Sequence, residues 1–433
     1  MKEIIIPGSK SITNRVLLLA AIGHSPVTLH NLLESDDTVH MRGVLSSFGV
    51  KFESVGQSLL VTPPAKLVGD GESHFIGNAG TVARFVSAVS LIIEGQYGLQ
   101  GVDRMHERPQ ADLFTALRGL GVQIDCTQND GFLPARYEGM GGSLENRVVT
   151  LSGRVSSQFV SALLLVAPLI KGGLRIEMEE IPPSQPYIEM TLEILKHWGV
   201  RFELPEEGRI MDISEGMTPP AEYTIPADMS GASYPSSWAT LRQEALQIKD
   251  YGSVTLQGDE GFAEICAHYG ARVTKAGEDC SFSDFTSASA PTTFDFSPMP
   301  DVAMTGMVMA CFYEGDWKFI GLESLRVKEC DRIQAMVDGF TQLGIHTTVE
   351  DDDVTIQGGA YWQSAENLAQ IQAAQVETNS HDDHRIAMCF GVLRSTLSKN
   401  SGIPAEELFT IGEPHCVAKT WPNFWQDLAY WEA

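Results

Sequence analysis

The sequence feature that most constrains the fold is a short junction that occurs five times along the chain. Each copy has an apolar-periodic stretch, then a glycine, then a small or β-branched residue and alternating polarity. The first copy is residues 45–52, Leu-Ser-Ser-Phe-Gly-Val-Lys-Phe. This order is typical of a helix that ends at a left-handed glycine and is followed directly by a strand. The junction glycines are Gly49, Gly121, Gly199, Gly270 and Gly344.

The spacing of these glycines predicts a repeated α/β unit. Successive glycines are 72, 78, 71 and 74 residues apart, which one chance junction would not produce. This step fits about six times into 433 residues, so a sixth unit is expected near the C-terminus, completed by the N-terminal strand. Buried helices are expected at 14–22 and 157–169, and strands at 147–151 and 174–178. Proline-rich residues 217–228 are the expected linker between two halves of three units each.

Charge and composition exclude several functions. The chain has 30 Lys and Arg against 56 Asp and Glu, a net charge of −26, whereas nucleic-acid binding and anionic membranes require a basic surface. The longest apolar stretch, residues 162–170, is far shorter than the roughly 20 residues that span a bilayer. Residues 1–8 do not resemble a signal peptide. Seven scattered cysteines without a Cys-x-x-Cys motif indicate reduced thiols in the cytoplasm, with neither disulfides nor a zinc site.

Three segments place polar residues where an apolar helix is expected to begin. Residues 8–15, Gly-Ser-Lys-Ser-Ile-Thr-Asn-Arg, combine free backbone N–H groups and a positive helix end with two cations, which suits a phosphate. They do not form a Walker A loop. The other two segments are residues 77–81, Gly-Asn-Ala-Gly-Thr, and residues 156–158, Ser-Ser-Gln. Ordinary helix caps and a tight turn are the alternative interpretations.

Four further segments carry charge. Asp301 precedes an apolar stretch, so it is either a helix cap or a general base. Residues 326–332 hold five charges and are either a solvated face or a site, with Cys330 as a bystander. Residues 104–109, Arg-Met-His-Glu-Arg-Pro, predict a charged loop before a helix that Pro109 starts. Residues 381–385, His-Asp-Asp-His-Arg, are not expected to bind a metal, because Arg385 would repel a cation and no second ligand cluster exists.

Taken in order, these motifs resemble the 5-enolpyruvylshikimate-3-phosphate synthase (3-phosphoshikimate 1-carboxyvinyltransferase) family of enolpyruvyl transferases. The resemblance covers nearly the whole chain. Each motif is weak alone, but the ordered series is specific. The matching motifs are Gly-Ser-Lys-Ser-x-x-Asn-Arg, Gly-Asn-Ala-Gly-Thr, Glu-Arg-Pro, Ser-Ser-Gln, Ser-x-Pro-Tyr, Pro-Asp-x-Ala-Met-Thr, Arg-Val-Lys-Glu-x-Asp-Arg, Asp-His-Arg and Ala-Lys-Thr.

The resemblance implies an α/β fold of two similar domains. Each domain would hold three βαβαββ units with helices inside and sheets outside, an inside-out α/β barrel. Residues 9–226 would form the first domain. Residues 1–8 and 227–433 would form the second, with the active site in the cleft between them. A hinge between the domains and a monomeric protein are also expected.

The resemblance also implies a reaction. The enolpyruvyl group of phosphoenolpyruvate would pass to the 5-hydroxyl of shikimate 3-phosphate by addition and elimination through a tetrahedral intermediate, releasing phosphate. No metal or organic cofactor is implied. Asp301 would act as the base, and Glu329 and Lys10 would move protons at the reacting carbons. The implied phosphoenolpyruvate ligands are Lys10, Asn78, Gly80, Arg108, Gln158, Arg332, Arg385 and Lys419. The implied shikimate 3-phosphate ligands are Lys10, Ser11, Arg15, Ser156, Ser157, Gln158, Ser184, Tyr187, Asp301, Ser324 and Lys328.

The sequence departs from the family pattern at three positions. Ser324 stands where many members have Asn, which puts one bond to shikimate 3-phosphate in doubt. Cys330 replaces a small hydroxyl residue, and Phe85 replaces a Pro behind Gly80. Since Gly80 has no side chain, sensitivity to glyphosate, an inhibitor of this family, is expected.

Two other interpretations stay open at this point. One is the related transferase that acts on UDP-N-acetylglucosamine, which usually carries a catalytic Cys in its first half. The only Cys here before residue 266 is Cys126. The other is an inactive scaffold of the same fold, against which the joint presence of Lys10, Asp301, Glu329 and Arg332 argues.

Overall fold

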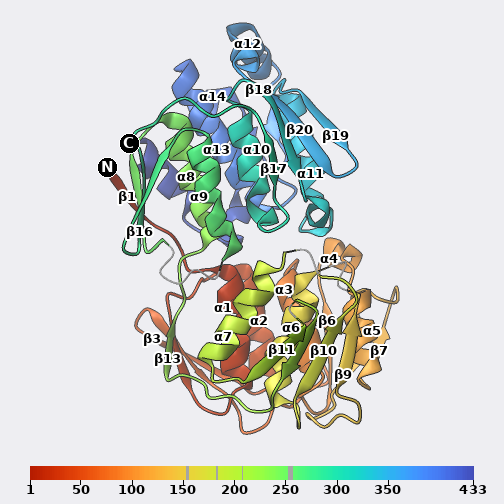
Figure 1. Cartoon of the computed structure of the whole chain (residues 1–433). Helices are drawn as coiled ribbons and strands as arrows, with labels where there is room; N and C mark the ends of the chain where they lie inside the picture. The colour runs from red at the N-terminus through yellow and green to blue at the C-terminus, as the bar shows by residue number, and fades with distance from the viewer. Residues whose placement is uncertain (153–155, 182–183, 207, 252–256) are drawn as a thin grey trace. The chain divides into compact units, whose positions relative to one another are not determined.

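The computed structural model describes residues 1–152, 156–181, 184–206, 208–251 and 257–433 (Figure 1). The chain divides into two compact units. The N-terminal unit is Gly8–Ile225. The C-terminal unit is Met1–Pro7 together with Pro226–Ala433. The boundary between them lies one residue from the expected crossings at 8 and 226.

Each predicted junction is a helix, a left-handed glycine and a strand. The glycine φ angles are +96°, +104°, +69°, +97° and +75° along the chain. The helices that end there are α2 (Asp36–Ser47), α5 (Ala111–Gly119), α7 (Pro186–His197), α9 (Phe262–His268) and α11 (Arg332–Gln342). The strands that follow are β3 (Lys51–Val55), β7 (Gln123–Cys126), β11 (Phe202–Glu206), β15 (Arg272–Ala276) and β19 (Thr347–Glu350). The predicted repeat is therefore confirmed.

One repeat illustrates the sheet topology. Its elements are β5 (Ser73–Phe75), α3 (Gly80–Val89), β6 (Gln96–Gln100), α5, β7 and β8 (Ala135–Glu138). β5 pairs in parallel with β6, and β8 lies antiparallel to both β6 and β7. The sheet order is β5-β6-β8-β7, and four other sheets of the described chain have the same order. Each is a βαβ crossover extended by a hairpin, as the family resemblance implied.

The N-terminal unit contains three complete sheets. Their orders are β13-β2-β4-β3, β5-β6-β8-β7 and β11-β12-β10-β9. In the first, β13 pairs in parallel with β2, from the opposite end of the unit. The remaining elements are α1 (Lys10–Ile22), β2 (Val27–His30), β4 (Ser58–Thr62), α4 (Asp103–Glu107), β9 (Val148–Leu151), α6 (Ser157–Val166), β10 (Leu174–Met178), β12 (Ile210–Ile213) and β13 (Glu222–Thr224).

The C-terminal unit contains two complete sheets and one short pair. Their orders are β1-β14-β16-β15, β17-β18-β20-β19 and β21-β22. The strands are β1 (Lys2–Ile5), β14 (Leu246–Lys249), β16 (Asp279–Ser283), β17 (Thr293–Asp295), β18 (Gly315–Ile320), β20 (Asp353–Gly358), β21 (Glu377–Thr378) and β22 (Thr410–Ile411). The remaining helices are α8 (Met229–Arg242), α10 (Ala303–Ala310), α12 (Ala365–Ala373), α13 (His384–Ser401), α14 (Ala405–Leu408) and α15 (Phe424–Glu432).

The expectation that the N-terminal strand completes the sixth unit is wrong. β1 pairs in parallel with β14, so it completes the fourth unit. The sixth unit has only the parallel pair of β21 and β22. Its hairpin is replaced by the 3-10 helix η6 (Pro414–Lys419) and by α15. The described residues therefore form six repeat units, of which five have a four-stranded sheet and the sixth has a two-stranded one.

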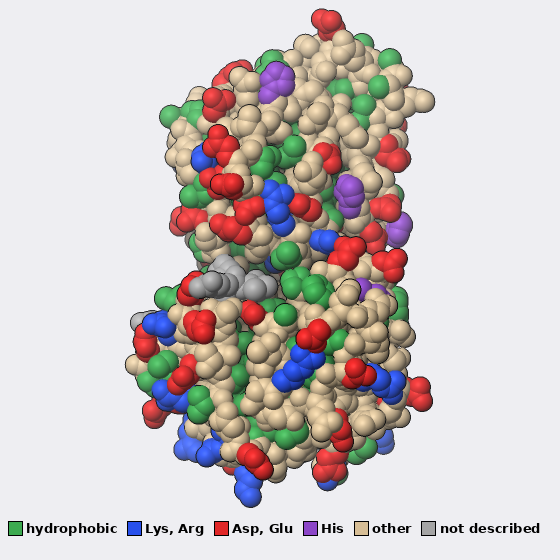
Figure 2. Space-filling view, turned by 90° about the vertical axis from the view of Figure 1, so that its right-hand side faces the viewer, with side chains coloured by type: hydrophobic (Ala, Val, Ile, Leu, Met, Phe, Trp, Pro, Cys, Tyr) green, Lys and Arg blue, Asp and Glu red, His purple; other side chains and the backbone are tan. Residues whose placement is uncertain are grey.

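The first helix of each repeat is buried. In α1, all residues from Ile12 to Ile22 are buried, as expected for a helix that is apolar on all sides. α3, α6, α10 and the first half of α13 are similarly buried. In Figure 1 α8, α10 and α13 lie toward the middle of the C-terminal unit and α1, α3 and α6 toward the middle of the N-terminal unit, with several strands toward the outside. No described helix is both long and apolar enough to cross a bilayer. On the face shown in Figure 2, acidic side chains are scattered rather than gathered into one patch.

Candidate active site

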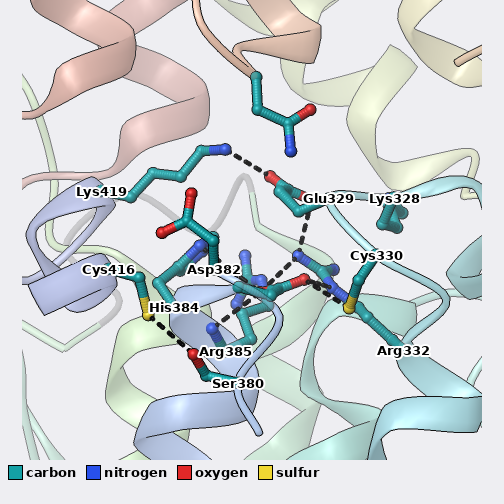
Figure 3. Close-up of polar contacts among 12 residues, drawn as sticks. Lys328, Glu329, Cys330, Arg332, Ser380, Asp382, His384, Arg385, Cys416 and Lys419 are labelled. Carbon is teal, nitrogen blue, oxygen red and sulfur yellow. Dashed lines mark hydrogen bonds and ion pairs between the residues drawn. The ribbon is translucent and has the colours of Figure 1, made fainter. Parts of the chain in front are cut away.

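A cluster of charged side chains gathers where three segments of the C-terminal unit begin their helices (Figure 3). One segment is the 3-10 helix η3 (Pro300–Val302) before α10, the second precedes α11, and the third precedes α13. We call this set the charge cluster. Its members are Asp301, Lys328, Glu329, Arg332, Asp383, Arg385 and Lys419, four cations and three carboxylates.

Arg332 lies at the centre of the charge cluster. Its side chain is almost fully buried, and each of its three guanidinium nitrogens meets a different carboxylate. Nη1 is 3.0 Å from Asp301 Oδ1, Nη2 is 2.9 Å from Glu329 Oε2, and Nε is 2.7 Å from Asp383 Oδ2. Burial alone would lower the pKa of Arg332, but the three carboxylates raise that pKa above its usual value. Arg332 therefore stays charged and fixes the positions of three acids.

Asp301 is surrounded by positive charge. Besides Arg332, its carboxylate oxygens lie 3.1 Å from Arg385 Nη2 and 3.4 Å from Lys328 Nζ. Burial acts to raise the pKa of Asp301, but the three cations outweigh it and hold that pKa well below the usual range. Burial also lowers the pKa of Lys328. In this arrangement Asp301 is ionised and is a weak base.

Glu329 and Lys419 form the second part of the charge cluster. Lys419 Nζ is 3.3 Å from Glu329 Oε1, and the other oxygen of Glu329 accepts from Arg332. Glu329 is buried, and Lys419 ends η6 with little exposure. This pair places a carboxylate and an ammonium group side by side, and either type of group can act as a general acid or base.

A strained turn positions the third segment. His381 and Asp382 both have positive φ, +52° and +53°, which is uncommon for residues other than glycine. Asp383 then caps α13, because its Oδ1 accepts a hydrogen bond of 2.9 Å from the backbone N–H of Arg385. The turn therefore directs Asp383 toward Arg332 and Arg385 toward Asp301. Among the described residues, no group of three or more His, Cys, Asp or Glu side chains is arranged to hold a metal ion.

In the N-terminal unit, the starts of α1, α3 and α6 gather at one end. Arg15, the sixth residue of α1, donates to Ser161 Oγ of α6 at 3.2 Å and lies 5.3 Å from the ring centroid of Phe85 of α3. Phe85 and Ser161 are the sixth and fifth residues of their helices, so the three helices meet within their first two turns, near the positive charge of their N-termini. We call these ends the helix-start cluster. Its predicted members are Lys10, Ser11, Asn78, Gly80, Ser156, Ser157 and Gln158.

Two guanidinium groups converge on Gly80. A methyl group built on Gly80 would lie 2.2 Å from Arg84 Nη1 and 2.4 Å from Arg108 Nη2. Arg108 Nη1 donates to the backbone oxygen of Asn78 at 2.9 Å and to its Oδ1 at 3.2 Å. A helix N-terminus with two guanidinium groups beside it is a favourable binding site for an anion. The predicted charged loop at 104–109 is instead the short helix α4, and α5 begins at Ala111 rather than at Pro109, since Gln110 caps it.

Arg15 lies within the protein rather than on its surface. It donates to Thr191 Oγ1 at 2.8 Å and to the backbone oxygens of Ser11 and Tyr187 at 2.9 and 3.2 Å. Burial lowers the pKa of Arg15 to about 10. Arg15 therefore ties α1 to the start of α7, where Ser184 has a φ of +60° and Tyr187 is half-buried.

The structure gathers the predicted site residues into two groups, one in each unit. Ser324 lies half-buried on the 3-10 helix η4 (Glu323–Val327), just before Lys328. Lys10 Nζ lies 3.7 Å from Asp37, whose carboxylate is buried. Cys330, predicted to be a bystander, is buried with its Sγ 3.6 Å from Asp383 Oδ2.

Three residues of these two groups, Asp37, Arg84 and Asp383, were not predicted from the sequence. Arg84 was detectable, because it lies four residues after Gly80 and therefore on the same helix face. Asp383 was visible as a helix cap within the 381–385 motif.

Comparison with known proteins agrees with the resemblance. Residues 1–428 match the family described as EPSP synthase (3-phosphoshikimate 1-carboxyvinyltransferase). A relative from Paraburkholderia phymatum named 3-phosphoshikimate 1-carboxyvinyltransferase is 35% identical, covering 97% of this chain and 94% of the relative. Relatives with the same name from Burkholderia multivorans and Vibrio campbellii are 37% and 32% identical. Each alignment covers 98% of this chain, with 95% and 96% of the relatives.

Solved structures share the fold. The EPSP synthase of Acinetobacter baumannii superposes with a TM-score of 0.72 at 23% sequence identity, over 100% of this chain and 95% of that one. A second structure of EPSP synthase from this organism gives a TM-score of 0.69 at 22% identity. The predicted fold of two units with inside-out α/β topology is therefore confirmed.

Proposed function

Because the chain belongs to the EPSP synthase (3-phosphoshikimate 1-carboxyvinyltransferase) family, we propose that its charge cluster and helix-start cluster are the two halves of one active site. The chain transfers the enolpyruvyl group of phosphoenolpyruvate to shikimate 3-phosphate in the biosynthesis of aromatic compounds. The route is addition of the 5-hydroxyl to C2 with protonation at C3, followed by loss of that proton and of phosphate. The observation that carries the assignment is the contact of Asp301 with three cations.

Asp301 is the base, and the substrates activate it. Without anions, Lys328, Arg332 and Arg385 hold its pKa too low for it to accept a proton readily. The phosphate and carboxylate groups of the substrates are competing partners for Lys328 and Arg385, whereas Arg332 is held by two further carboxylates. As Lys328 and Arg385 turn to the substrates, the pKa of Asp301 rises toward the value that proton abstraction from a hydroxyl needs.

Glu329 and Lys10 handle the proton at C3 of phosphoenolpyruvate. Glu329 is buried between Arg332 and Lys419, which hold its carboxylate in one orientation. Lys10 begins α1, and its Nζ lies 3.7 Å from the buried carboxylate of Asp37. One of the two donates the proton in the addition step and recovers it in the elimination step.

The helix-start cluster binds the anionic groups. Arg108, Gly80, Asn78 and Gln158 hold phosphoenolpyruvate together with Lys10, Arg332, Arg385 and Lys419. Shikimate 3-phosphate is held by Ser11, Ser156, Ser157, Ser184, Tyr187, Ser324 and Lys328, with Lys10, Gln158 and Asp301. Arg15 completes this set by fixing the backbone of Ser11 and Tyr187.

We also infer that the two units are the two domains of the enzyme, 9–226 and 1–8 with 227–433, and that the active site forms in the cleft between them. Since the proposed ligands come from both units, substrate binding would close the domains around a hinge. The protein would act as a cytoplasmic monomer, with the two small molecules as its only substrates. Small-angle scattering should show compaction when shikimate 3-phosphate and glyphosate are added. An unchanged radius of gyration would contradict closure.

The assignment of Asp301 is tested by phosphate release with Asp301→Asn. The variant keeps the shape of the side chain but has no charge and no basic oxygen. We expect turnover to fall by at least about 10²-fold, the usual contribution of a general base, while calorimetry still detects binding of shikimate 3-phosphate. Unchanged turnover would contradict the base assignment. Asp338→Asn, an exposed position on α11, is the matched control.

The same assay separates the alternative interpretations. Release of phosphate from phosphoenolpyruvate by the natural chain should require shikimate 3-phosphate. Release with UDP-N-acetylglucosamine instead would assign the chain to the related transferase. Release with neither would identify an inactive scaffold.

A further inference from the structure

One buried carboxyl group, Asp259, lies near the charge cluster without a role in the proposed reaction. It belongs to the 3-10 helix η2 (Gly258–Gly261) in the C-terminal unit and is only 4% exposed. Buried carboxylates normally have charged partners. The hydrogen-bond partner of Asp259 is instead a neutral hydroxyl, because Ser230 Oγ donates to Oδ2. Its other oxygen, Oδ1, is buried and accepts no hydrogen bond from the residues that the structure describes. This environment favours the protonated form.

The charged and titratable groups that face Asp259 come from four elements. Asp228 caps α8, Asp301 lies in η3, Arg385 is on α13, and Tyr251 precedes η2. Burial raises the pKa of Asp259 to about 7, and the charges of Asp301 and Asp228 add to this, while Arg385 and Ser230 oppose it. Burial raises the pKa of Tyr251 well above its usual value, so Tyr251 is neutral. The neighbouring Glu260 forms an ion pair with Lys275.

Arg385 connects Asp259 to the proposed reaction. Its Nη2 lies 3.1 Å from Asp301, and its charge also reaches Asp259. When Asp259 is protonated, it does not offset the charge of Arg385, which therefore attracts a further anion more strongly. When Asp259 is ionised, a second negative charge offsets Arg385 and repels an incoming anion.

We propose that Asp259 is a positioning residue whose protonation sets how strongly Arg385 attracts phosphoenolpyruvate. The inference rests on the proposed function, in which Arg385 binds that substrate. It predicts that affinity for phosphoenolpyruvate weakens as pH rises through neutrality, because Asp259 ionises. Linkage requires the reverse effect as well, so binding of the anion at Arg385 draws a proton onto Asp259.

The test compares the natural chain with Asp259→Asn, which keeps the size of the side chain but is always neutral. KM for phosphoenolpyruvate and kcat are measured by phosphate release between pH 6 and 8.5. Dividing the KM of the natural chain by the KM of Asp259→Asn at each pH removes the effect of the substrate's own ionisation, which is the same for both proteins. We expect KM of the natural chain, relative to Asp259→Asn, to rise about tenfold over this range, equivalent to about 1.4 kcal/mol, while the ratio of kcat values stays level.

Two further variants sharpen the test. Glu264→Gln changes an exposed carboxylate on the neighbouring α9 and should follow the natural chain at every pH. Ser230→Ala removes the hydroxyl that stabilises the ionised form of Asp259, so it should move the change in KM to higher pH. A KM ratio that does not change with pH, or a Ser230→Ala profile that moves to lower pH, would overturn the proposal.

Calorimetry gives a readout that does not need turnover. Phosphoenolpyruvate is titrated at pH 7.5 and 5 °C into protein saturated with shikimate 3-phosphate, and the Asp301→Asn substitution blocks turnover. The experiment is repeated in two buffers of different ionisation enthalpy. Proton uptake should be larger in Asp301→Asn than in the double variant with Asp259→Asn. Equal uptake would refute the role of Asp259, whereas absence of phosphate release by the natural chain would refute the proposed function alone.

Discussion

At the residue scale, Gly80 shows how a missing side chain makes room for charge. The tips of Arg84 and Arg108 occupy the space where a β-carbon would lie. Both tips belong to flexible side chains, so a methyl group there displaces them without unfolding α3. The glycine motif at 77–81 predicted a tight helix start, but the sequence did not indicate which cations meet there, because their convergence depends on α4 and on side-chain rotamers.

Gly80→Ala should therefore weaken binding of phosphoenolpyruvate and of glyphosate while the protein remains folded. We expect KM for phosphoenolpyruvate to rise about tenfold or more, the cost of about 1.4 kcal/mol for one displaced charge-assisted hydrogen bond. The thermal midpoint should change little. Gly43→Ala in α2 is the matched control, since nothing lies within 4 Å of its added β-carbon. An unchanged KM in Gly80→Ala would contradict the assignment of Gly80 to the site.

The residues of the charge cluster could be chosen from the sequence, but their pairing could not. Asp301 stood out because it precedes an apolar segment, and the family resemblance implied Glu329 and Arg332. The folded chain adds Asp383, which holds Arg332 from a segment about fifty residues away. The contacts among Asp301, Lys328, Glu329 and Arg332 lie within the fifth repeat, but those with Asp383, Arg385 and Lys419 depend on how the sixth repeat packs against it.

At the element scale, equivalent helices of the two units begin differently. Ser9 and Ser156 cap α1 and α6, and α3 has no side-chain cap. Asp228 and Asp383 cap α8 and α13, and Asp301 precedes α10. The N-terminal unit therefore leaves its positive helix ends open to anions, whereas the C-terminal unit uses carboxylates that hold cations.

The junction glycines show what a repeat in the sequence does and does not predict. Their left-handed conformation was predictable from helix, glycine and strand in succession. Their steric surroundings were not, because these depend on loops from elsewhere. A β-carbon on Gly270 would lie 2.2 Å from the backbone oxygen of Thr286, whereas one on Gly277, which also has positive φ, would meet nothing within 4 Å.

Gly270→Ala should therefore destabilise the C-terminal unit more than Gly277→Ala. For Gly277→Ala we expect a loss of about 1–2 kcal/mol, the usual cost of the left-handed conformation for a residue with a β-carbon. Gly270→Ala carries the same cost and must also displace backbone. Denaturant midpoints measured by circular dichroism compare the two variants. Equal midpoints would show that the loop at Thr286 can move away from the added β-carbon at no measurable cost in stability.

At the scale of the whole molecule, the net charge of −26 opposes capture of anionic substrates. The proposed site uses local cations, so distant acids act only through the long-range field. Added salt screens that field first, since the Debye length is about 10 Å at 0.1 M.

We expect kcat/KM at low substrate concentration to rise as KCl increases to about 0.1 M. At higher salt it should fall, because the cations of the proposed site are then screened as well. At saturating substrate concentrations, kcat should change less between zero and about 0.1 M KCl, because substrate capture no longer limits the rate. A fall in kcat/KM from the lowest salt onward would show that the local cations dominate at all distances.

The pairing of β1 with β14 has a consequence for synthesis on the ribosome. Residues 2–5 find their partners only at residues 246–249. At about 5–20 residues per second, the strand waits roughly 12–50 seconds after it emerges, while the entire Gly8–Ile225 unit is translated. The N-terminal unit can thus fold first on the nascent chain, with β1 tethered beside it as a free end. A chain stalled once residue 225 has left the ribosome would carry a folded unit and an unpaired strand that is open to chaperones.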